Sequence, residues 1–562
     1  MVKFFGTDGI RGEFGGRCVN AEVAKKLGVA IVSFINEQNS KQNSKQSGQQ
    51  ANHTNVNVND DLQNIVVVLG QDTRESGSLL AEAIACGAKQ KSVNANVTIL
   101  NMGVVPTPCV SFACGEIAKI ANISNISKLN CVGVMVSASH NKYSDNGFKI
   151  FDSSGFKIGD DFVEYIEDFL SSDYDFADDF TDDFTDDFAD DSGNNLVINS
   201  VSNKGDDVGA YDLVNVDRLI DDYCQNIVLS CGKLTKNAED NNAQENDAKE
   251  NNTQSNNAQR NNSKESKLGC VILDAANGAG FGVGSRVFEI MNFGSTIINN
   301  NPNGKNINDN CGATDLTNLI NFVKTKEEGV DAGFALDGDA DRVAIVDSHG
   351  EAFNGDNVIC AIAIWLKKLN MLKDDAIVVT SVSNGGVEAC LAKHNIKVFR
   401  CDVGDRSVMN EIRKRGLSFG GEESGHLIFA DFNKCGDGVF SAAFLSLLMV
   451  KTGLTIKQLM NVEFNSRFQV KGDISHSMAT PHLPSNIEAK IKLIEDCVTK
   501  FFNDIGNADR VVIRASGTEK KVRFMIECDD ENLRNRVCES VKQNIALALK
   551  DEELTIEKSL KD

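Results

Sequence analysis

The feature that most constrains the fold is a repeated alternation between short apolar runs and longer amphipathic runs. The run IVVVLG at 65–70 precedes LLAEAIACGAKQ at 79–90, and CVILDAANGAG at 270–280 precedes VGSRVFEIMN at 283–292. A third pair is AIVVTSVSNGG at 376–386 and VEACLAKHN at 387–395. Short strands followed by amphipathic helices are typical of βα units in parallel or mixed sheets. The alternation therefore predicts an α/β protein.

The last hundred residues follow a different pattern. The stretch ADRVVIRASGTEKKVRFMIECDD at 508–530 predicts two strands around a polar turn, and a helix is predicted from Asn532 to Leu549. Single cores rarely grow beyond about 250 to 300 residues, so a chain of 562 residues must contain several domains. We expect three related α/β domains and a C-terminal α+β domain.

Three segments of biased composition interrupt the pattern, two of them inside expected domains and one between domains. Residues 39–61 and 237–267 are rich in Asn, Gln and Ser or Lys, and they carry too little apolar surface to offset the entropy of ordering them. We interpret them as mobile loops inserted into α/β domains. The predicted limits are domain I at 1–170, an acidic insert or linker at 171–207, domain II at 208–347, domain III at 348–464 and domain IV at 465–562.

The net charge of −23 limits the kinds of partner. Nucleic acid and anionic membranes attract proteins of the opposite charge, so neither is expected as a partner. Ten aspartates lie between 173 and 191 in a four-residue repeat. A calcium site there would need a glycine turn and a terminal glutamate, which the repeat lacks, so a solvated acidic segment is the simpler interpretation.

The sixteen cysteines contain no C-x-x-C pair, which favours reduced, mostly buried thiols over a disulfide framework or a zinc site. The N-terminal sequence MVKFFGTDGIRGEFGG lacks the apolar stretch of a signal peptide, and no segment approaches 18 continuous apolar residues. We expect a cytoplasmic protein.

Polar loops that follow apolar runs are the candidate sites. In GVMVSASHNKYSDNGFKIF at 133–151, a strand-like run ends at Ser137, Ala138, Ser139 and His140. A serine beside a histidine suggests a hydrolase nucleophile, but the G-x-S-x-G turn is absent. A turn whose hydroxyls cap the next element is the structural alternative.

The loop ALDGDADRVAIVD at 335–347 holds Asp337, Asp339 and Asp341 at alternate positions. In an extended or tightly turned backbone these three side chains converge. Three carboxylates at such a short distance from one another repel, which is costly unless a cation lies among them. Oxygen ligands favour Mg²⁺. The alternative is a solvated acidic turn, although apolar runs flank the loop on both sides.

Two further loops favour a sugar phosphate as ligand. In FGGEESGHLIF at 419–429, Glu422 and Ser424 can present a carboxylate and a hydroxyl to sugar hydroxyls. In the loop RASGT at 514–518, an arginine, two hydroxyls and a conformationally permissive glycine suit a phosphate dianion. These residues are Arg514, Ser516, Gly517 and Thr518. An ordinary turn is the alternative for each loop. Together the four loops indicate phosphoryl transfer, which needs positioning and charge neutralisation.

At this point the chain resembles the α-D-phosphohexomutases, and within them the branch that acts on glucosamine phosphate. The resemblance spans almost the whole chain outside the inserts, and its motifs occur in the family's order. They are FGTDGIRG at 5–12, SASHN at 137–141, DNGFKIF at 145–151, NINDNCGATDL at 306–316, DGDADR at 337–342, GGEESGH at 420–426, GDGV at 436–439 and RASGTE at 514–519.

The resemblance implies four domains around a central cleft and specific residue roles. Ser139 would be carried as phosphoserine, the phosphoryl donor, and would bind one Mg²⁺ together with Asp337, Asp339 and Asp341. Further roles are implied for Arg11 and Arg342 in stabilising the transferring group, for His140 or Lys149 in proton transfer, for Glu422 and Ser424 in sugar binding, and for Arg514, Ser516, Gly517 and Thr518 in holding the second phosphate. The resemblance also implies that Arg342 binds the substrate.

By the same resemblance the chain interconverts glucosamine 6-phosphate and glucosamine 1-phosphate through a 1,6-bisphosphate, which is both intermediate and activator. This reaction would supply UDP-N-acetylglucosamine and cell-wall synthesis, by a monomer or homodimer. Lys142, Ala515 and Lys520 stand where the family usually has proline, and Ala340 where glycine is common; none of these removes a functional group.

Three rival functions are weighed against this one. A phosphomannomutase or phosphoglucomutase of the same family differs only in contacts to sugar hydroxyls. A non-catalytic scaffold that binds sugar phosphate predicts loss of Ser139, of a triad aspartate or of Arg514, and all of these are present. A serine hydrolase would react with a fluorophosphonate probe.

Overall fold

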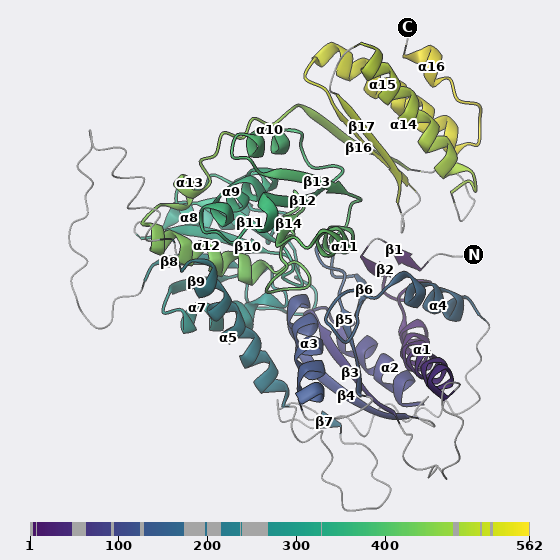
Figure 1. The fold of residues 1–562 in the computed structure, drawn as a ribbon, viewed down its shortest axis with the longest axis vertical. Helices are drawn as coiled ribbons and strands as arrows, with labels where there is room; N and C mark the ends of the chain where they lie inside the picture. The colour runs from purple at the N-terminus through teal and green to yellow at the C-terminus, as the bar shows by residue number, and fades with distance from the viewer. Residues whose placement is uncertain are drawn as a thin grey trace, which may run out of the picture. The chain divides into compact units, whose positions relative to one another are not determined.

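The computed structural model describes residues 4–6, 8–47, 63–90, 95–123, 129–172, 197–198, 215–236, 238, 268–326, 329–475, 483–505, 509–516 and 521–560. The chain divides into two compact units, which are described separately (Figure 1). Unit 1 contains Asp8–Phe353 and Ser424–Leu459, and unit 2 contains Asn354–Glu423 and Met460–Asp562. Met1–Phe4 belongs to unit 1 and Phe5–Thr7, with the short strand β1 (Phe5–Gly6), to unit 2.

The first sheet of unit 1 is mixed. Its interior strand β3 (Gln63–Gln71) pairs in parallel with β4 (Ala95–Val104) and β5 (Leu129–Val136), whereas β6 (Asp145–Phe151) runs antiparallel between β5 and β2 (Gly9–Glu13). A two-residue strand, β7 (Val197–Ile198), pairs with β4. The side chains of 65–69 are at most 3% exposed, which explains why β3 is apolar without alternation.

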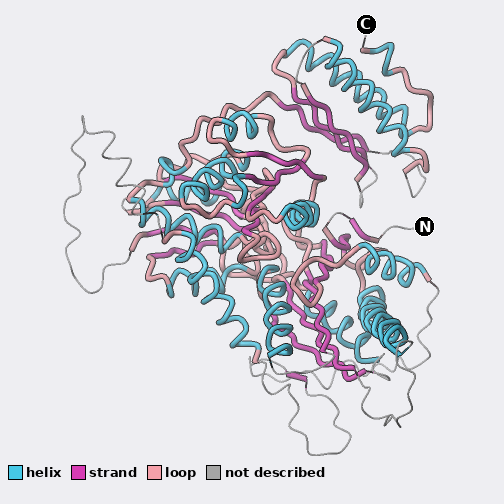
Figure 2. Tube along the Cα trace, viewed as in Figure 1, coloured by secondary structure: helices cyan, strands magenta, loops and turns pink. Residues whose placement is uncertain are grey.

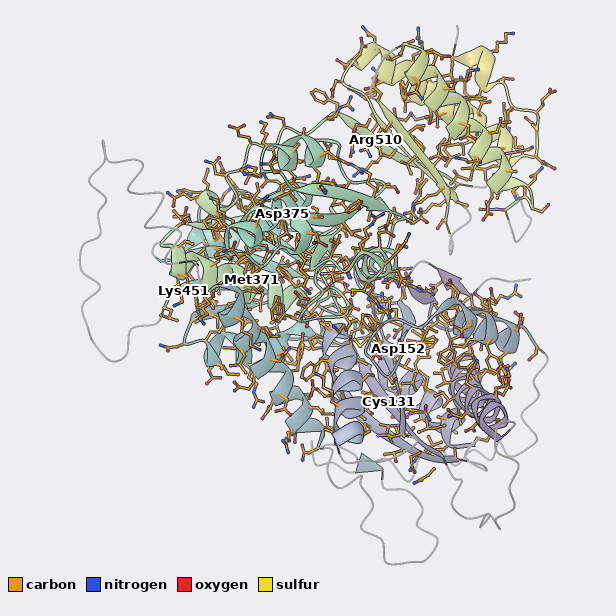
Figure 3. The ribbon with its side chains drawn as sticks, in the orientation of Figure 1. Cys131, Asp152, Met371, Asp375, Lys451 and Arg510 are labelled. Atoms are coloured by element: carbon orange, nitrogen blue, oxygen red, sulfur yellow. The ribbon has the colours of Figure 1, made fainter. Side chains whose placement is uncertain are left out.

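Helices cover both faces of this sheet. Figure 2 shows its strands between α3 (Thr107–Ile123) on one side and α1 (Ala21–Ser47) with α2 (Gly77–Gln90) on the other. The helix α4 (Asp160–Ser171) packs on α1, where the rings of Phe34 and Phe162 stack 3.9 Å apart. Cys131, labelled in Figure 3, marks the buried part of β5.

The second sheet of unit 1 has the order β11-β10-β8-β9. The strands β10 (Ala332–Leu336) and β11 (Val343–Asp347) form an antiparallel hairpin, and β10 also pairs in parallel with β8 (Cys270–Asp274). The remaining elements are β9 (Gly294–Ile298), β15 (Leu427–Phe429), α5 (Val216–Leu234), α7 (Gly280–Ile290), α8 (Thr317–Thr325), α12 (Gly438–Thr452) and α13 (Ile456–Leu459). The hairpin places residues 337–342 at its turn.

Unit 2 contains an α/β part and an α+β part. In the first, β12 (Ala376–Thr380) runs parallel between β13 (Lys397–Cys401) and β14 (Phe419–Gly421), with α9 (Gly355–Lys368), α10 (Gly386–Ala392), α11 (Asp405–Arg415) and a 3₁₀ turn at Lys373–Asp375. In the second, β18 (Lys521–Glu527) pairs antiparallel with β16 (Gln469–Ser475) and β17 (Arg510–Ala515), and the helices are α14 (Ile487–Asp504), α15 (Glu531–Leu549) and α16 (Ile556–Ser559).

These elements confirm the predicted α/β fold class with its α+β C-terminal part. The predicted helix from Asn532 to Leu549 corresponds to α15, and the predicted strands of the last hundred residues correspond to β17 and β18. All sixteen cysteines are free thiols, eleven of them buried, as expected. No helix in the described ranges is long and apolar enough to cross a membrane.

The prediction of a loop at 39–61 is wrong for its first part. The helix α1 continues to Ser47, and the Ser40 hydroxyl donates to the Asn36 carbonyl within it. A helix that is already nucleated gains one hydrogen bond for each residue added, so a polar, Gln- and Lys-containing extension can remain helical without burying a face. Residues 48–61, the acidic repeat at 173–191 and nearly all of 237–267 lie outside the described residues.

Candidate active site

The serine loop follows β5 directly. Ser139 is completely buried and has a φ of 55°, the left-handed conformation that is unusual for a residue other than glycine. Its hydroxyl donates to Asp337 Oδ2 at 2.5 Å, and its N–H donates to the Ser137 hydroxyl at 2.9 Å. The strand therefore ends where the serine side chain meets the aspartate loop of the second sheet.

The three aspartates converge at the turn between β10 and β11. One carboxylate oxygen from each of Asp337, Asp339 and Asp341 lies within 4.8 Å of the others, and all three residues are buried. Ala340 between them has a φ of 57°, which is the physical reason for a glycine preference at this position. The predicted convergence of the carboxylates is confirmed.

The donor set fits a hard divalent cation. Asp339 Oδ1 and Asp341 Oδ1 are buried and have no hydrogen-bond partner among the described residues. Unpaired carboxylate oxygens are costly inside a protein, and oxygen ligands of this kind suit Mg²⁺. The three aspartates with Ser139 Oγ are thus the group that could hold the metal.

Lys149 offsets part of the negative charge. Its Nζ lies 2.6 Å from Asp339 Oδ2 and also contacts Asp341 Oδ2. Burial, and then the charges of Asp341 and Asp339, raise the pKa of Asp337 to about 7. Burial also opposes ionisation of Asp341, but Lys149 and other positive neighbours outweigh it and keep the pKa of Asp341 below its usual range.

The two loops touch because residue 338 is glycine. A Cβ at Gly338 would lie 2.6 Å from the Ser139 carbonyl oxygen and 2.8 Å from Ile307 Cδ1, closer than real contacts allow. Glycine is therefore required for the aspartate turn to approach the serine loop at this distance.

Positive groups gather beside the same loops. Arg342 Nε lies 3.8 Å from Asp337 Oδ2 and 3.7 Å from Asp341 Oδ1, and Arg11 donates to Asp8. Burial and then Arg342 lower the pKa of Arg11. Burial, Arg342 and Arg11 lower the pKa of His140 to about 3, and its Nδ1 has no partner among the described residues. A cluster of this kind favours an anion.

Four residues at this site were given no role by the sequence. The hydroxyl of Thr107 donates to Asp339 Oδ2, while its N–H donates to the Asp339 carbonyl at 3.0 Å. His426 Nδ1 lies 3.6 Å from Asp341 Oδ1, and its Nε2 accepts from the Gly436 N–H at 3.1 Å. The other two, Arg74 and Asn308, contact the Ser139 loop.

A signal for some of these residues was present in the sequence. Arg74 follows the apolar run of β3 as part of Asp72-Thr73-Arg74, the same position after a strand that singled out the other loops. Thr107 begins α3 directly after a proline, where a helix start was readable. Asn308 and His426 lie within quoted motifs, but their partners are distant in sequence and no local pattern predicts them.

Asp437 supports the His426 region from the start of α12. Its carboxylate caps the helix by accepting from the Phe440 N–H at 2.8 Å, and it also accepts from Tyr223 Oη at 2.8 Å and Asn433 Nδ2 at 3.0 Å. Burial raises the pKa of Asp437 to about 6 although all three hydrogen bonds oppose the shift. The cap therefore links α12 to α5 within unit 1.

The other predicted residues are divided between the units. Ser424 belongs to unit 1, whereas Glu422, Arg514 and Ser516 belong to unit 2. Glu422 Oε1 accepts from the Gly404 N–H at 2.9 Å, and burial followed by Arg523 lowers the pKa of Arg514. Gly517 and Thr518 lie outside the described residues.

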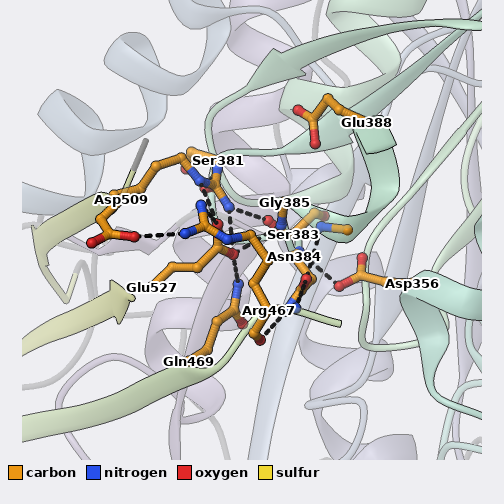
Figure 4. Close-up of polar contacts among 12 residues, drawn as sticks. Asp356, Ser381, Ser383, Asn384, Gly385, Glu388, Arg467, Gln469, Asp509 and Glu527 are labelled. Atoms are coloured by element: carbon orange, nitrogen blue, oxygen red, sulfur yellow. Dashed lines mark hydrogen bonds and ion pairs between the residues drawn. The ribbon is translucent and has the colours of Figure 1, made fainter. Parts of the chain in front are cut away.

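A polar joint connects the two parts of unit 2 (Figure 4). Glu527, which is fully buried, accepts from Arg510 Nη2 at 2.9 Å, Gln469 Nε2 at 2.7 Å and the Gly385 N–H at 2.8 Å. Arg467 adds a longer contact to Glu527, and its backbone exchanges hydrogen bonds with the Asn384 side chain. The loop after β12 is thereby fastened to the C-terminal sheet.

Comparison with known proteins gives matches to four domain families along the chain. They are described as phosphoglucomutase/phosphomannomutase alpha/beta/alpha domain I at residues 50–175, domain II at 249–350, domain III at 354–466 and the C-terminal domain at 482–543.

Full-length relatives agree with these matches. A phosphoglucosamine mutase of Aliarcobacter butzleri is 31% identical over 528 residues, 94% of this chain and 95% of its own length. A phosphoglucosamine mutase of Campylobacter hominis is 31% identical over 556 residues, 98% and 100% of the two lengths. A crystal structure of a phosphoglucomutase/phosphomannomutase family protein from Burkholderia thailandensis superimposes with a TM-score of 0.62 at 18% identity, over 99% of this chain and 100% of that one, and supports the fold.

Proposed function

The chain belongs to the phosphoglucomutase/phosphomannomutase family and is a phosphohexomutase, an isomerase, and on this premise we propose that it interconverts glucosamine 6-phosphate and glucosamine 1-phosphate. The observation that carries the catalytic part is the buried Ser139 hydroxyl, 2.5 Å from Asp337 at the point where three carboxylates converge. A hydroxyl in this position is suited to carry a phosphoryl group.

The metal-binding role is proposed for Asp337, Asp339 and Asp341 together with an oxygen on Ser139. These carboxylates hold unpaired buried oxygens, which supports the proposal. When bound, Mg²⁺ would supply neutralisation of the charge on the transferring phosphoryl group. Lys149 contributes a further positive charge that stays in place, since it is buried between Asp339 and Asp341.

The basic residues of the site have two proposed roles, charge stabilisation and proton transfer. Arg11 and Arg342 would stabilise the charge of the phosphoryl group through guanidinium hydrogen bonds. His140 and Lys149 remain the two candidates for the proton of the attacking hydroxyl. Lys149 is bound by two carboxylates, which supports a role in charge stabilisation. His140 Nδ1 has no partner among the described residues, but the pKa of His140 is lowered to about 3, so its ring is unprotonated and a weak base at neutral pH.

The reaction consists of two half-reactions. In the first, the bond between phosphorus and Ser139 Oγ breaks, a bond from phosphorus to O1 of glucosamine 6-phosphate forms, and the O1 proton passes to the base. The 1,6-bisphosphate then reorients. In the second, the 6-phosphoryl group moves from O6 to Ser139 Oγ, O6 regains a proton, and glucosamine 1-phosphate is released. The phosphoserine enzyme is restored.

Substrate holding is proposed for residues of both units. Glu422 and Ser424 would bind sugar hydroxyls, and the second phosphate would be held by Arg514, Ser516, Gly517 and Thr518. Burial, and then the neighbouring Arg523, lower the pKa of Arg514, and a partly desolvated guanidinium beside a second arginine supports anion binding there. We also propose the domain limits given above.

The choice of the amino sugar rests on the relatives, whose names specify phosphoglucosamine mutase over nearly the full length of this chain. On this basis the enzyme would serve UDP-N-acetylglucosamine and cell-wall synthesis, with glucosamine 1,6-bisphosphate as activator. A cytoplasmic location and a monomeric or homodimeric state stay predictions.

A coupled assay tests the proposal. The purified protein, with Mg²⁺ and a trace of glucose 1,6-bisphosphate, is compared on the 6-phosphates of glucosamine, glucose and mannose. The proposal expects the highest kcat/KM for glucosamine 6-phosphate and no turnover by Ser139→Ala. A preference for mannose or glucose phosphate would instead favour the phosphomannomutase or phosphoglucomutase alternative, and turnover by the variant would exclude Ser139 as the donor.

A further inference from the structure

Arg74 is a buried arginine whose two terminal nitrogens donate into the serine loop. It lies in the turn after β3 and is only 2% exposed. Its Nε donates to Asp72 Oδ2 at 2.9 Å, and its two terminal nitrogens donate to four backbone carbonyls of one short segment. These are the carbonyls of Ser139 at 3.0 Å, Asn141 at 2.9 Å, Asp145 at 2.9 Å and Lys142.

The guanidinium therefore has no N–H left for a ligand. A guanidinium has five N–H groups, and each has a partner within the protein. Its charge is paired with the Asp72 carboxylate, which is fully buried as well. Arg74 thus differs from Arg342 and Arg11 because it can act on the reaction only through the backbone that it holds.

That backbone includes the unusual conformation of Ser139. A φ of 55° is disfavoured for serine and persists only where the surroundings impose it. The Ser139 carbonyl is held by Arg74 and by Asn308 Nδ2 at 2.8 Å. The Ser139 N–H is held by the Ser137 hydroxyl, which donates in turn to Asp72 Oδ2 at 2.6 Å. Arg74 and Asp72 therefore hold the peptide groups on both sides of Ser139.

We propose that Arg74, paired with Asp72, is a positioning residue that fixes the left-handed turn at Ser139 and so directs the Ser139 hydroxyl to Asp337. The proposal rests on the proposed function of Ser139 as the phosphoryl donor. With the turn relaxed, the carbonyl would no longer face Arg74 and the hydroxyl would leave the aspartates. Misplacement of a reacting group by about 1 Å can cost about 100-fold in rate.

The test uses Arg74→Lys, which keeps the charge but can satisfy at most three of the five hydrogen bonds. The full-length protein is incubated with glucose 1,6-bisphosphate and Mg²⁺, and the rate of phosphoryl transfer to Ser139 is followed by intact mass and peptide mapping. Steady-state kcat and KM are measured in parallel. The matched control is Arg218→Lys, an arginine whose side chain is 75% exposed on α5.

A positioning role predicts that Arg74→Lys lowers the transfer rate and kcat by about 10- to 100-fold, with KM within about twofold, and that Arg218→Lys changes neither. If Arg74→Lys does not fold, Asn308→Gly replaces it, because glycine accepts the φ of 57° at this position and removes the amide that donates to the Ser139 and Asn141 carbonyls, two of the carbonyls that Arg74 holds. Asn308→Gly should also lower kcat without changing KM, and the fall in kcat should be smaller than for Arg74→Lys.

The outcomes separate this proposal from the one on which it rests. A wild-type protein that transfers phosphate to Ser139, with a folded variant that transfers it equally fast, overturns the role of Arg74 alone. A rise in KM at unchanged kcat also overturns it, because that result indicates substrate binding. A wild-type protein that never phosphorylates Ser139 overturns the proposed function, and the positioning role with it.

Discussion

At the scale of single residues, the site depends on how closely two loops approach. The aspartate turn meets the Ser139 carbonyl at Gly338, where a Cβ would be 2.6 Å from the carbonyl oxygen. The hydrogen bond between Ser139 and Asp337 can form only because Gly338 has no side chain that would keep the two loops apart.

Gly338→Ala should therefore lower kcat by about 100-fold, because the added methyl group separates the nucleophile from the carboxylates. The coupled assay measures the change, and circular dichroism checks that the variant is folded. Gly282→Ala is the matched control: it lies in α7 with nothing within 4 Å of the new Cβ, and it should leave kcat unchanged. A Gly338→Ala enzyme within twofold of wild type would contradict this account of the contact.

Thr107 orients Asp339 through its hydroxyl and its N–H. Removing a residue that hydrogen-bonds to a metal ligand typically lowers metal affinity by about 10- to 100-fold. We expect Thr107→Val to raise the Mg²⁺ concentration for half-maximal activity by about 10-fold. Thr452→Val, which removes a buried hydroxyl that donates to the Leu448 carbonyl of its own helix and accepts from the Leu454 N–H, should not change it. Equal Mg²⁺ dependence in the two variants would refute the orienting role.

At the scale of elements, the Glu527 carboxylate lies at the centre of the joint of unit 2. Glu527 connects Arg510 on β17, Gln469 on β16 and Gly385 beside α10. Arg510 on β17 is labelled in Figure 3. Removing one partner of a buried charged pair leaves the others without compensation.

Glu527→Gln should reduce the free energy of unfolding by about 2 to 3 kcal/mol at pH 7, since charged hydrogen bonds are lost while the neighbouring arginines remain. Burial opposes ionisation of Glu527, but the hydrogen bonds from Arg510 and Gly385 outweigh it and lower the pKa of Glu527 below 4.5. Its contribution to stability is therefore complete above pH 4.5 and is lost as the pH falls through the lowered value.

Urea unfolding at several pH values measures this. The difference in the free energy of unfolding between wild type and Glu527→Gln should be constant above about pH 5 and should decrease below pH 4.5. Glu463→Gln, at an exposed pair with Lys393, is the control and should have no measurable effect. A difference that widens on acidification would show that the sign assigned to Glu527 is incorrect.

At the scale of the whole molecule, the sequence predicted the elements better than the contacts between them. The strand β3 and the hairpin at 508–530 were readable because burial and turn chemistry act locally. The convergence of Asp337, Asp339 and Asp341 was readable because their spacing is local too. The positions of Arg74 and Thr107 carried a signal, but their roles were missed, since their partners lie 65 and 232 residues away and only the folded chain brings them together.

The error at 39–47 arises because a helix can extend from residues upstream. Composition alone suggested a loop, yet α1 extends through this polar segment because propagation of an existing helix needs no buried face. Composition therefore describes what a segment cannot bury, and it does not exclude regular structure that begins upstream.

The most direct test of the central claim is a single-turnover experiment on Ser139. The enzyme is loaded with radiolabelled phosphate from glucose 1,6-bisphosphate, mapped by peptide analysis and then mixed with unlabelled glucosamine 6-phosphate. The account predicts one labelled peptide containing Ser139, transfer of the label to the sugar within one turnover, and no label on Ser139→Ala. Label on another residue, or its release only as inorganic phosphate, would contradict it.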